Sequence, residues 1–230
     1  NAAIKFKEFI NNDNSSDVDR QADAWIRVGD CYFIQRQYNN AITSYNNALK
    51  ISDKNADYAY FQQAMGYGAL GKSKEKTDKL SIIINRYPKS TFYDRSIYET
   101  GITHLNSNDN RSAIASFEKI IKERPRSQYA RKALMKIGMI HYNNDDNAKA
   151  LGKLKELVAQ YPNTEESREA LNIISNIYRD NNDIQSYFDY IAQNNLAEIS
   201  IDKQDSLTFR NIEDFYSSKN YKETIKGANK

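Results

Sequence analysis

One spacing, 37 residues, recurs along this 230-residue chain and constrains its fold more than any other feature. Apolar, helix-like stretches carry a small residue at intervals of 35, 37, 37 and 37 residues, at Gly29, Ala64, Gly101, Gly138 and Ser175. The prolines repeat the interval, because 37 residues separate Pro88 from Pro125 and Pro125 from Pro162. A fixed period of this size is the signature of a repeat array, in which each unit buries its apolar face against its neighbours.

Within a unit, large and small residues follow an order typical of two antiparallel helices. Large residues three and four positions apart form one face of a helix, and a small residue lets the paired helix approach closely. We therefore expect Gly101 to face Ala113 in the third unit. A proline cannot continue a helix and restricts the residue before it, so each second helix is predicted to end just before Tyr87-Pro88, Arg124-Pro125 and Tyr161-Pro162.

This order resembles the tetratricopeptide repeat. The first unit shows it as Trp25, Val28, Gly29, Tyr32, Ala41, Tyr45 and Ala48, and the third as Ile97, Thr100, Gly101, His104, Ala113, Phe117, Ile120 and Pro125. The resemblance implies an all-α fold, a right-handed superhelical solenoid of antiparallel helix pairs. It also implies a protein that binds another protein or peptide segment.

The period divides the chain into units. We expect residues 1–230 to form a single solenoid fragment, with further repeats of a parent chain at both ends, and residues 2–12 to form the second helix of a truncated repeat. Lys76 and Tyr187 replace the small residue of the second helix, and Ile212 replaces that of a first helix, so local packing is in doubt there. The predicted repeats are 22–55, 57–93, 94–130, 131–167, 168–204, which is degenerate, and 205–230, which is partial.

The length of the period suggests a compartment. A tetratricopeptide unit has about 34 residues, so these units are longer by about three. Elongated units resemble bacterial cell-envelope members, including the lipoprotein of outer-membrane β-barrel assembly and the accessory protein of the Tol-Pal system. This resemblance implies a protein of the periplasm or outer membrane of a Gram-negative bacterium.

The composition excludes several other classes. Eight glycines and three prolines are too few for a turn-rich β-sandwich, and no apolar stretch is long enough for a membrane helix. A single cysteine, Cys31, excludes an internal disulfide framework and a cysteine-rich zinc site.

Candidate catalytic groups are few. His104 and His141, the only histidines, share a repeat position filled by tyrosine in other units, which favours an aromatic packing role over a metal site. Cys31 has no predictable histidine partner, and the adjacent Asp30 disfavours a thiolate. We predict that the chain is not an enzyme and binds no metal or cofactor.

A basic segment raises the alternative of a polyanion partner. Between residues 111 and 136 there are eight basic and two acidic residues, a local charge of +6, although the whole chain carries only +3. These residues span two predicted helices and a linker, so we expect them on several faces, without a groove that follows phosphates. No nucleic-acid partner is therefore predicted.

The main binding hypothesis concerns the first helix of each repeat. In tetratricopeptide superhelices, its positions two, five, nine and twelve line the concave groove. Here they are rich in aromatic residues and methionine, which suit an adaptable apolar contact surface. The predicted groove residues are Phe33, Tyr58, Phe61, Met65, Arg95, Tyr98, Ile102, Lys132, Met135, Met139 and Tyr142.

Charges in the groove further define the ligand. Arg95 and Lys132 share position two, where they could engage a carboxylate of the partner. Chaperone-binding family members instead use a lysine at position five, which Phe61 and Tyr98 occupy here, so that ligand class is disfavoured.

Two alternatives remain at this point. The groove side chains could merely pack neighbouring first helices. The chain could also be a structural spacer or self-assembly arm of a longer repeat protein that needs no ligand, in place of an interaction scaffold.

Overall fold

The computed structural model describes residues 2–12, 17–196 and 201–228, and every regular element within them is an α-helix. This confirms the all-α prediction. The predicted fifth and sixth repeats include residues 197–200 and 229–230, which lie outside the described residues. No helix of the described segments has the length and hydropathy needed to cross a membrane.

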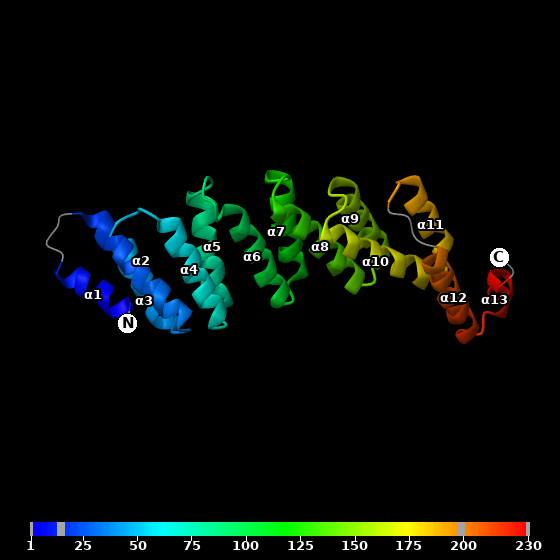
Figure 1. Ribbon diagram of the computed structural model, residues 1–230, viewed down its shortest axis with the longest axis horizontal. Coiled ribbons are helices and arrows are strands. Elements are labelled where there is room, and N and C mark those ends of the chain that lie inside the picture. The colour runs from blue at the N-terminus through cyan, green and yellow to red at the C-terminus, as the bar shows by residue number, and fades with distance from the viewer. Residues whose placement is uncertain (1, 13–16, 197–200, 229–230) are drawn as a thin grey trace. The chain divides into compact units, whose positions relative to one another are not determined.

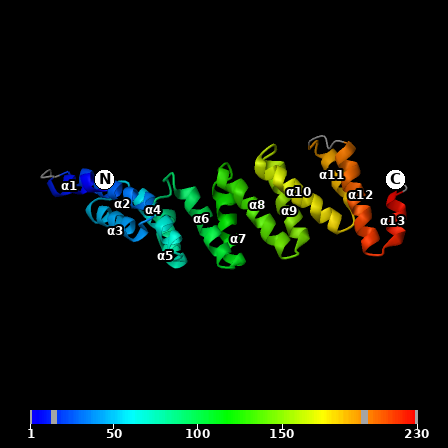
Figure 2. The same cartoon turned by 60° about the horizontal axis from the view of Figure 1, so that its bottom comes forward.

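The helices group into two compact units, Asn1–Ala133 and Leu134–Lys230, with the boundary inside helix α8 (Gln128–Asn143). In the first unit each helix packs against the one before it, as antiparallel pairs in chain order (Figures 1 and 2). Its helices are α1 (Ala2–Asn12), α2 (Val18–Ile34), α3 (Tyr38–Ile51), α4 (Ala56–Ala69), α5 (Ser73–Arg86), α6 (Tyr93–Asn106) and α7 (Asn110–Glu123).

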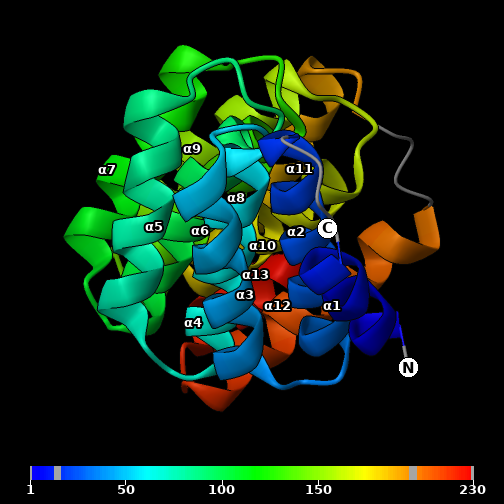
Figure 3. The ribbon, with the colours of Figure 1, turned by 90° about the vertical axis from the view of Figure 1, so that its left-hand side faces the viewer.

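The second unit repeats this arrangement, since consecutive helices again pack together. Its helices after α8 are α9 (Asn147–Gln160), α10 (Glu165–Asp180), α11 (Ile184–Gln193), α12 (Ile201–Ser217) and α13 (Tyr221–Ala228). Viewed from the N-terminal end, α1 lies beside α2, against which it packs (Figure 3).

The second helices end where the prolines predict. Helices α5, α7 and α9 end at Arg86, Glu123 and Gln160, each two residues before a proline. Every turn between the two helices of a pair has three residues, and the middle one has a left-handed backbone, at Arg36, Gly71, Asn108, Asp145, Asn182 and Lys219. These positions are 35, 37, 37, 37 and 37 residues apart, so the repeat register continues through α12 and α13.

Close helix contacts form at the repeated glycines, and a large side chain of the paired helix lies nearest each of them. A Cβ atom placed on Gly101 would lie 2.5 Å from the ring of Phe117, which is fully buried. Gly29 meets Tyr45 and Gly138 meets Leu154 in the same way. The predicted partner of Gly101, Ala113, lies four residues before Phe117 on α7; the large ring, not the alanine, takes the space that the missing side chain leaves.

Each irregular unit has a local compensation. The stem of Lys76 packs against Gly68, and its ammonium group lies 2.8 Å from the carboxylate of Glu99. Tyr187 is buried in place of the usual small residue. In the last pair, Ile212 replaces the small residue and the opposing helix supplies Gly227, whose Cβ position lies 2.8 Å from Ile212. Large and small residues have exchanged helices there.

Candidate partner-binding site

The predicted groove residues lie on four first helices. Phe33 is on α2, Tyr58, Phe61 and Met65 are on α4, and Arg95, Tyr98 and Ile102 are on α6. The remaining four are on α8, where Lys132 belongs to the first unit and Met135, Met139 and Tyr142 to the second. We therefore build the site from the first-unit residues.

Two of the predicted contact residues are buried. The exposed fraction is 3% for Phe61 and 4% for Met135, so neither side chain offers surface to a partner, and for these two the packing alternative holds. Other members are half-buried, including Met65, Tyr98 and Ile102. The most open side chain of the first-unit set is that of Arg95, which is 46% exposed.

Phe61 is buried because Phe92 and Arg95, at the start of the next first helix, cover it. Its ring stacks on that of Phe92, with centroids 4.9 Å apart and planes inclined by 24°. The guanidinium carbon of Arg95 lies 4.8 Å from the centre of the Phe61 ring, a distance at which cation–π attraction is significant. Of Phe61, Phe92 and Arg95, the exposed member is therefore Arg95, whose cation lies above the Phe61 ring.

A related arrangement recurs one repeat later, in which the cation lies over the second ring of the pair and the two rings are tilted by 41°. The rings of Tyr98 and Tyr129 lie 5.4 Å apart, and the ammonium nitrogen of Lys132 lies 5.9 Å from the centre of the Tyr129 ring. Each member is 37 residues after its counterpart: Phe61 and Tyr98, Phe92 and Tyr129, Arg95 and Lys132. We call these six residues the aromatic–cation ladder. The sequence-based prediction missed Phe92 and Tyr129, although their spacing of 37 residues would have revealed them.

Acidic neighbours leave the ladder positive. The one ion pair of Arg95 within residues 17–196 is a 4.0 Å contact with Glu99, whose other carboxylate oxygen bonds Lys76 at 2.8 Å. No described residue forms an ion pair with Lys132. Two other cations of the basic segment are paired: Arg124 lies 3.3 Å from Asp94 and Lys119 lies 3.0 Å from Glu123.

Tyr58 and Phe33 are engaged within the fold. The Tyr58 hydroxyl donates a hydrogen bond to Asp30, and the Phe33 ring meets Tyr38 edge-on at 5.3 Å. Burial, followed by this hydrogen bond to a carboxylate, raises the pKa of Tyr58 to about 12. Both side chains therefore support neighbouring helices as well as the predicted surface.

The histidines contact carboxylates that sequence reasoning did not anticipate. Nδ1 of His104 lies 3.9 Å from Asp109, and Nδ1 of His141 lies 3.7 Å from Asp146. Each aspartate caps the helix that follows, accepting a hydrogen bond from the backbone N–H of Ser112 or Lys149. No group of three or more potential metal ligands occurs among the described residues.

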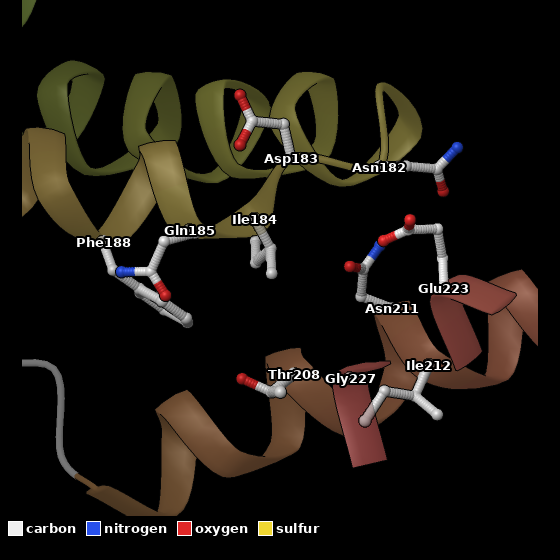
Figure 4. A pocket seen from close by; sticks show the side chains of 10 residues that line it. All are labelled: Asn182, Asp183, Ile184, Gln185, Phe188, Thr208, Asn211, Ile212, Glu223 and Gly227. Atoms are coloured by element: carbon white, nitrogen blue, oxygen red, sulfur yellow. The ribbon is translucent and has the colours of Figure 1, made fainter. Parts of the chain in front are cut away.

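A small polar pocket of about 200 Å³ lies in the second unit (Figure 4). The α10–α11 turn and α11 form one wall, and α12 and α13 the other. The Asn211 side chain is 5% exposed, and its amide nitrogen has no hydrogen-bond partner among the described residues. Val28, Ile137 and Ile174 hold the same repeat position and are fully buried, so the pocket is a gap in the packing between repeats.

The repeat geometry defines a tetratricopeptide repeat protein, whose fold generally mediates protein–protein interaction. Models of this repeat match residues 22–55 and 58–90. The model of the YfiO family, described as outer membrane lipoprotein, matches residues 90–224, which is 135 of the 230 residues. The chain belongs to this family. No curated protein sequence matches it.

Several solved structures have the same fold. MamA from Desulfovibrio magneticus RS-1 is 12% identical, with a TM-score of 0.55 over 78% of this chain and 97% of that one. BtubC from P. vanneervenii is 12% identical, with a TM-score of 0.58 over 90% and 86%. The repeats of a putative kinesin light chain from P. anserina are 13% identical, with a TM-score of 0.53 over 78% and 95%. At these identities the likeness concerns the fold alone.

Proposed function

We propose that this chain is a non-enzymatic scaffold that binds a segment of another protein along the first helices of its repeats. The site would comprise the aromatic–cation ladder together with half-buried residues at positions nine and twelve of the first helices. In the first unit these are Met65, Ile102 and Phe33. Within the second unit, Met139 and Tyr142 are half-buried at positions nine and twelve of α8.

The ladder is the observation that carries this proposal. Packing between repeats requires only apolar residues, yet in two successive repeats a cation lies at the ladder's surface, above the rings. Half-buried Met65 and Ile102 hold position nine on α4 and α6, the helices that carry Phe61 and Tyr98, and such side chains adapt to apolar groups of a partner. Anchoring residues with an apolar body and a polar head are typical of interface centres.

The family supports a compartment. Because the matching model describes an outer membrane lipoprotein, we place the scaffold at the periplasmic side of the outer membrane of a Gram-negative bacterium, within an envelope complex. Further repeats of its own parent chain would continue the stack at both ends.

Affinity capture tests the proposal. The immobilised chain would be exposed to a detergent extract of the envelope of the bacterium that encodes it, beside a Met65→Gln/Ile102→Gln variant. The matched control is Ile82→Gln/Ile121→Gln, which changes half-buried residues of the second helices α5 and α7. We expect the native chain and the control to retain one partner that the first variant loses, with all three folded by circular dichroism. Equal retention by both variants would exclude the site.

A second function, a structural spacer that assembles end to end, is favoured by the last helix pair. Phe209 on α12 and Ile225 on α13 are 61% and 63% exposed. The repeat counterpart of Ile225 in α3, Ile42, is buried and covers Gly66 of the next repeat. The counterparts of Phe209 in α4 and α6 are Phe61 and Tyr98, whose rings contact Phe92 and Tyr129 at or just before the start of the next first helix. This face therefore carries the side chains that elsewhere receive a further repeat.

Sedimentation velocity distinguishes the two functions. A spacer predicts association that rises with concentration and disappears in Phe209→Ser/Ile225→Ser, while Ile34→Ser, at an exposed residue that ends α2, leaves it intact. A monomer at every concentration would remove self-assembly by this chain alone.

A further inference from the structure

We infer that the partner segment is acidic, with carboxylates that bind Arg95 and Lys132 on successive repeats. This inference rests on the proposed function and specifies its ligand. Three features of the ladder support it: the placement of Arg95 over a ring, the unpaired charge of Lys132, and the restriction of cations at position two to these two first helices.

Arg95 is oriented to receive a carboxylate. A guanidinium that stacks through its flat face keeps its N–H donors at the edge, where they match the two oxygens of a carboxylate. The guanidinium carbon of Arg95 lies over the Phe61 ring at 4.8 Å from its centre, whereas Glu99 approaches no nearer than 4.0 Å and is committed to Lys76. A half-exposed arginine held in this way loses little conformational entropy when it binds an anion.

Lys132 supplies a second cation one repeat further along the chain. It holds the same repeat position as Arg95, is half-buried beside the Tyr129 ring, and has no ion pair within the described residues. Two cations on separate repeats are satisfied together by a chain that carries at least two carboxylates. A free carboxylate would meet only one of them.

Among the first helices α2 to α10, only α6 and α8 carry a cation at position two. That position holds Asp23 on α2, Tyr58 on α4, Arg95 on α6 and Lys132 on α8, and then Glu169 on α10. At position two, the repeats before and after these two cations thus hold a neutral and an acidic residue, and the net charge of the chain is only +3. Attraction of an acidic segment would depend on these two groups more than on the field of the whole molecule.

The rings of the ladder argue against a nucleic acid. Sequence-independent binding of single strands uses exposed aromatic faces on which bases stack. Phe61 is 3% exposed, with Phe92 and Arg95 against its ring, and the rings of Phe92, Tyr98 and Tyr129 are each half-buried. An acidic polypeptide needs only the cations and is therefore the favoured ligand.

Fluorescence anisotropy with the whole chain tests this inference. The probe is a labelled peptide of alternating Glu and Leu, compared with the same peptide carrying Gln in place of every Glu, and with a labelled oligothymidylate. The test variant is Arg95→Gln/Lys132→Gln. Its matched control is Arg111→Gln/Lys122→Gln, which removes one arginine and one lysine at exposed positions of the same basic segment.

We expect the Glu peptide to bind, to weaken with added salt, and to lose about tenfold or more in affinity in the test variant. The control should stay within about twofold, as for exposed charges that make no specific contact. Equal losses in the two variants, or tighter binding of oligothymidylate, would replace the inference with a general polyanion surface. Binding of the Gln peptide as tight as that of the Glu peptide would overturn the acidic ligand but leave the proposed scaffold standing. No binding of either peptide would overturn the inference alone, because the envelope capture tests the scaffold independently.

Discussion

Tyr45 on α3 and Tyr58 on α4 donate hydrogen bonds to the same carboxylate oxygen of Asp30, over 2.9 and 2.8 Å. Asp30 lies on α2, so this one acceptor links both helices of one repeat to the first helix of the next. Burial, followed by the charge of Asp30, raises the pKa of Tyr45, and burial followed by the hydrogen bond raises that of Tyr58 to about 12. The cluster therefore requires protonated tyrosines.

The first prediction concerns alkaline stability. The pKa of Tyr58 is about 12 in the folded chain and 10.0 in an ordinary tyrosine, so its stabilising contribution is complete below pH 10 and is lost as the pH rises towards 12. Denaturant unfolding at a series of pH values should show this loss, and Tyr58→Phe should reduce it. Tyr216→Phe, at a 65% exposed tyrosine, is the control and should leave the pH dependence unchanged. A Tyr58→Phe profile that matches the wild-type profile would contradict the assignment.

The second prediction uses two glycines with opposite surroundings. Gly101→Ala would place its Cβ 2.5 Å from the buried ring of Phe117 and should lower the free energy of unfolding by about 1–3 kcal/mol. Gly152 lies within α9 with nothing within 4 Å of its Cβ position, so Gly152→Ala should raise that free energy by about 0.5–1 kcal/mol. Chemical denaturation measures both changes. If the two substitutions changed the free energy of unfolding in the same direction, this account of the close helix contact would be refuted.

Phe61 and the prolines mark the limit of what the sequence predicts. Prolines and glycines act through local backbone geometry, so the ends of α5, α7 and α9 follow from Pro88, Pro125 and Pro162 alone. The burial of Phe61 depends instead on Phe92, which precedes the next first helix and lies outside its apolar pattern. Position within a helix identifies a face, but exposure depends on what a neighbouring repeat places over it. Treating Phe61 and Met135 as accessible was therefore wrong, because both side chains are buried, and the binding roles of Arg95 and Lys132 stay predictions.

Lys76 provides the third prediction. Its ammonium group bonds Glu99 at 2.8 Å, with the side chains 13% and 21% exposed, so each charge is partly withdrawn from water. Lys76→Met and Glu99→Gln should each lower the free energy of unfolding by about 1–3 kcal/mol, because each leaves one partner without its counter-charge. The double variant should cost less than the sum of the two, with a coupling of at least about 0.5 kcal/mol. Additive costs would show that the pair contributes no interaction energy.

The Glu99→Gln variant also tests the proposed binding site, since Glu99 is the acidic neighbour of Arg95. Its removal should free Arg95 further and tighten binding of the Glu peptide, whereas Lys76→Met should free Glu99 to pair with Arg95 and weaken that binding. Anisotropy titrations of the two variants should therefore move in opposite directions. Shifts of the same sign would show that Glu99 does not compete for Arg95.

The last prediction concerns the packing gap between α11 and α12. Asn211 holds a position that isoleucine fills in α8 and α10, yet its amide nitrogen is buried without a partner beside a pocket of about 200 Å³. An unsatisfied buried donor costs about 1–3 kcal/mol, and added apolar volume can occupy part of the gap. Asn211→Ile should therefore raise the free energy of unfolding by about 1 kcal/mol or more, and Asn211→Asp should lower it, because a buried carboxylate would replace the amide. Thermal and denaturant unfolding of both variants would measure these changes. Destabilisation by Asn211→Ile would mean that the asparagine is satisfied in solution and that the pocket is a built polar site.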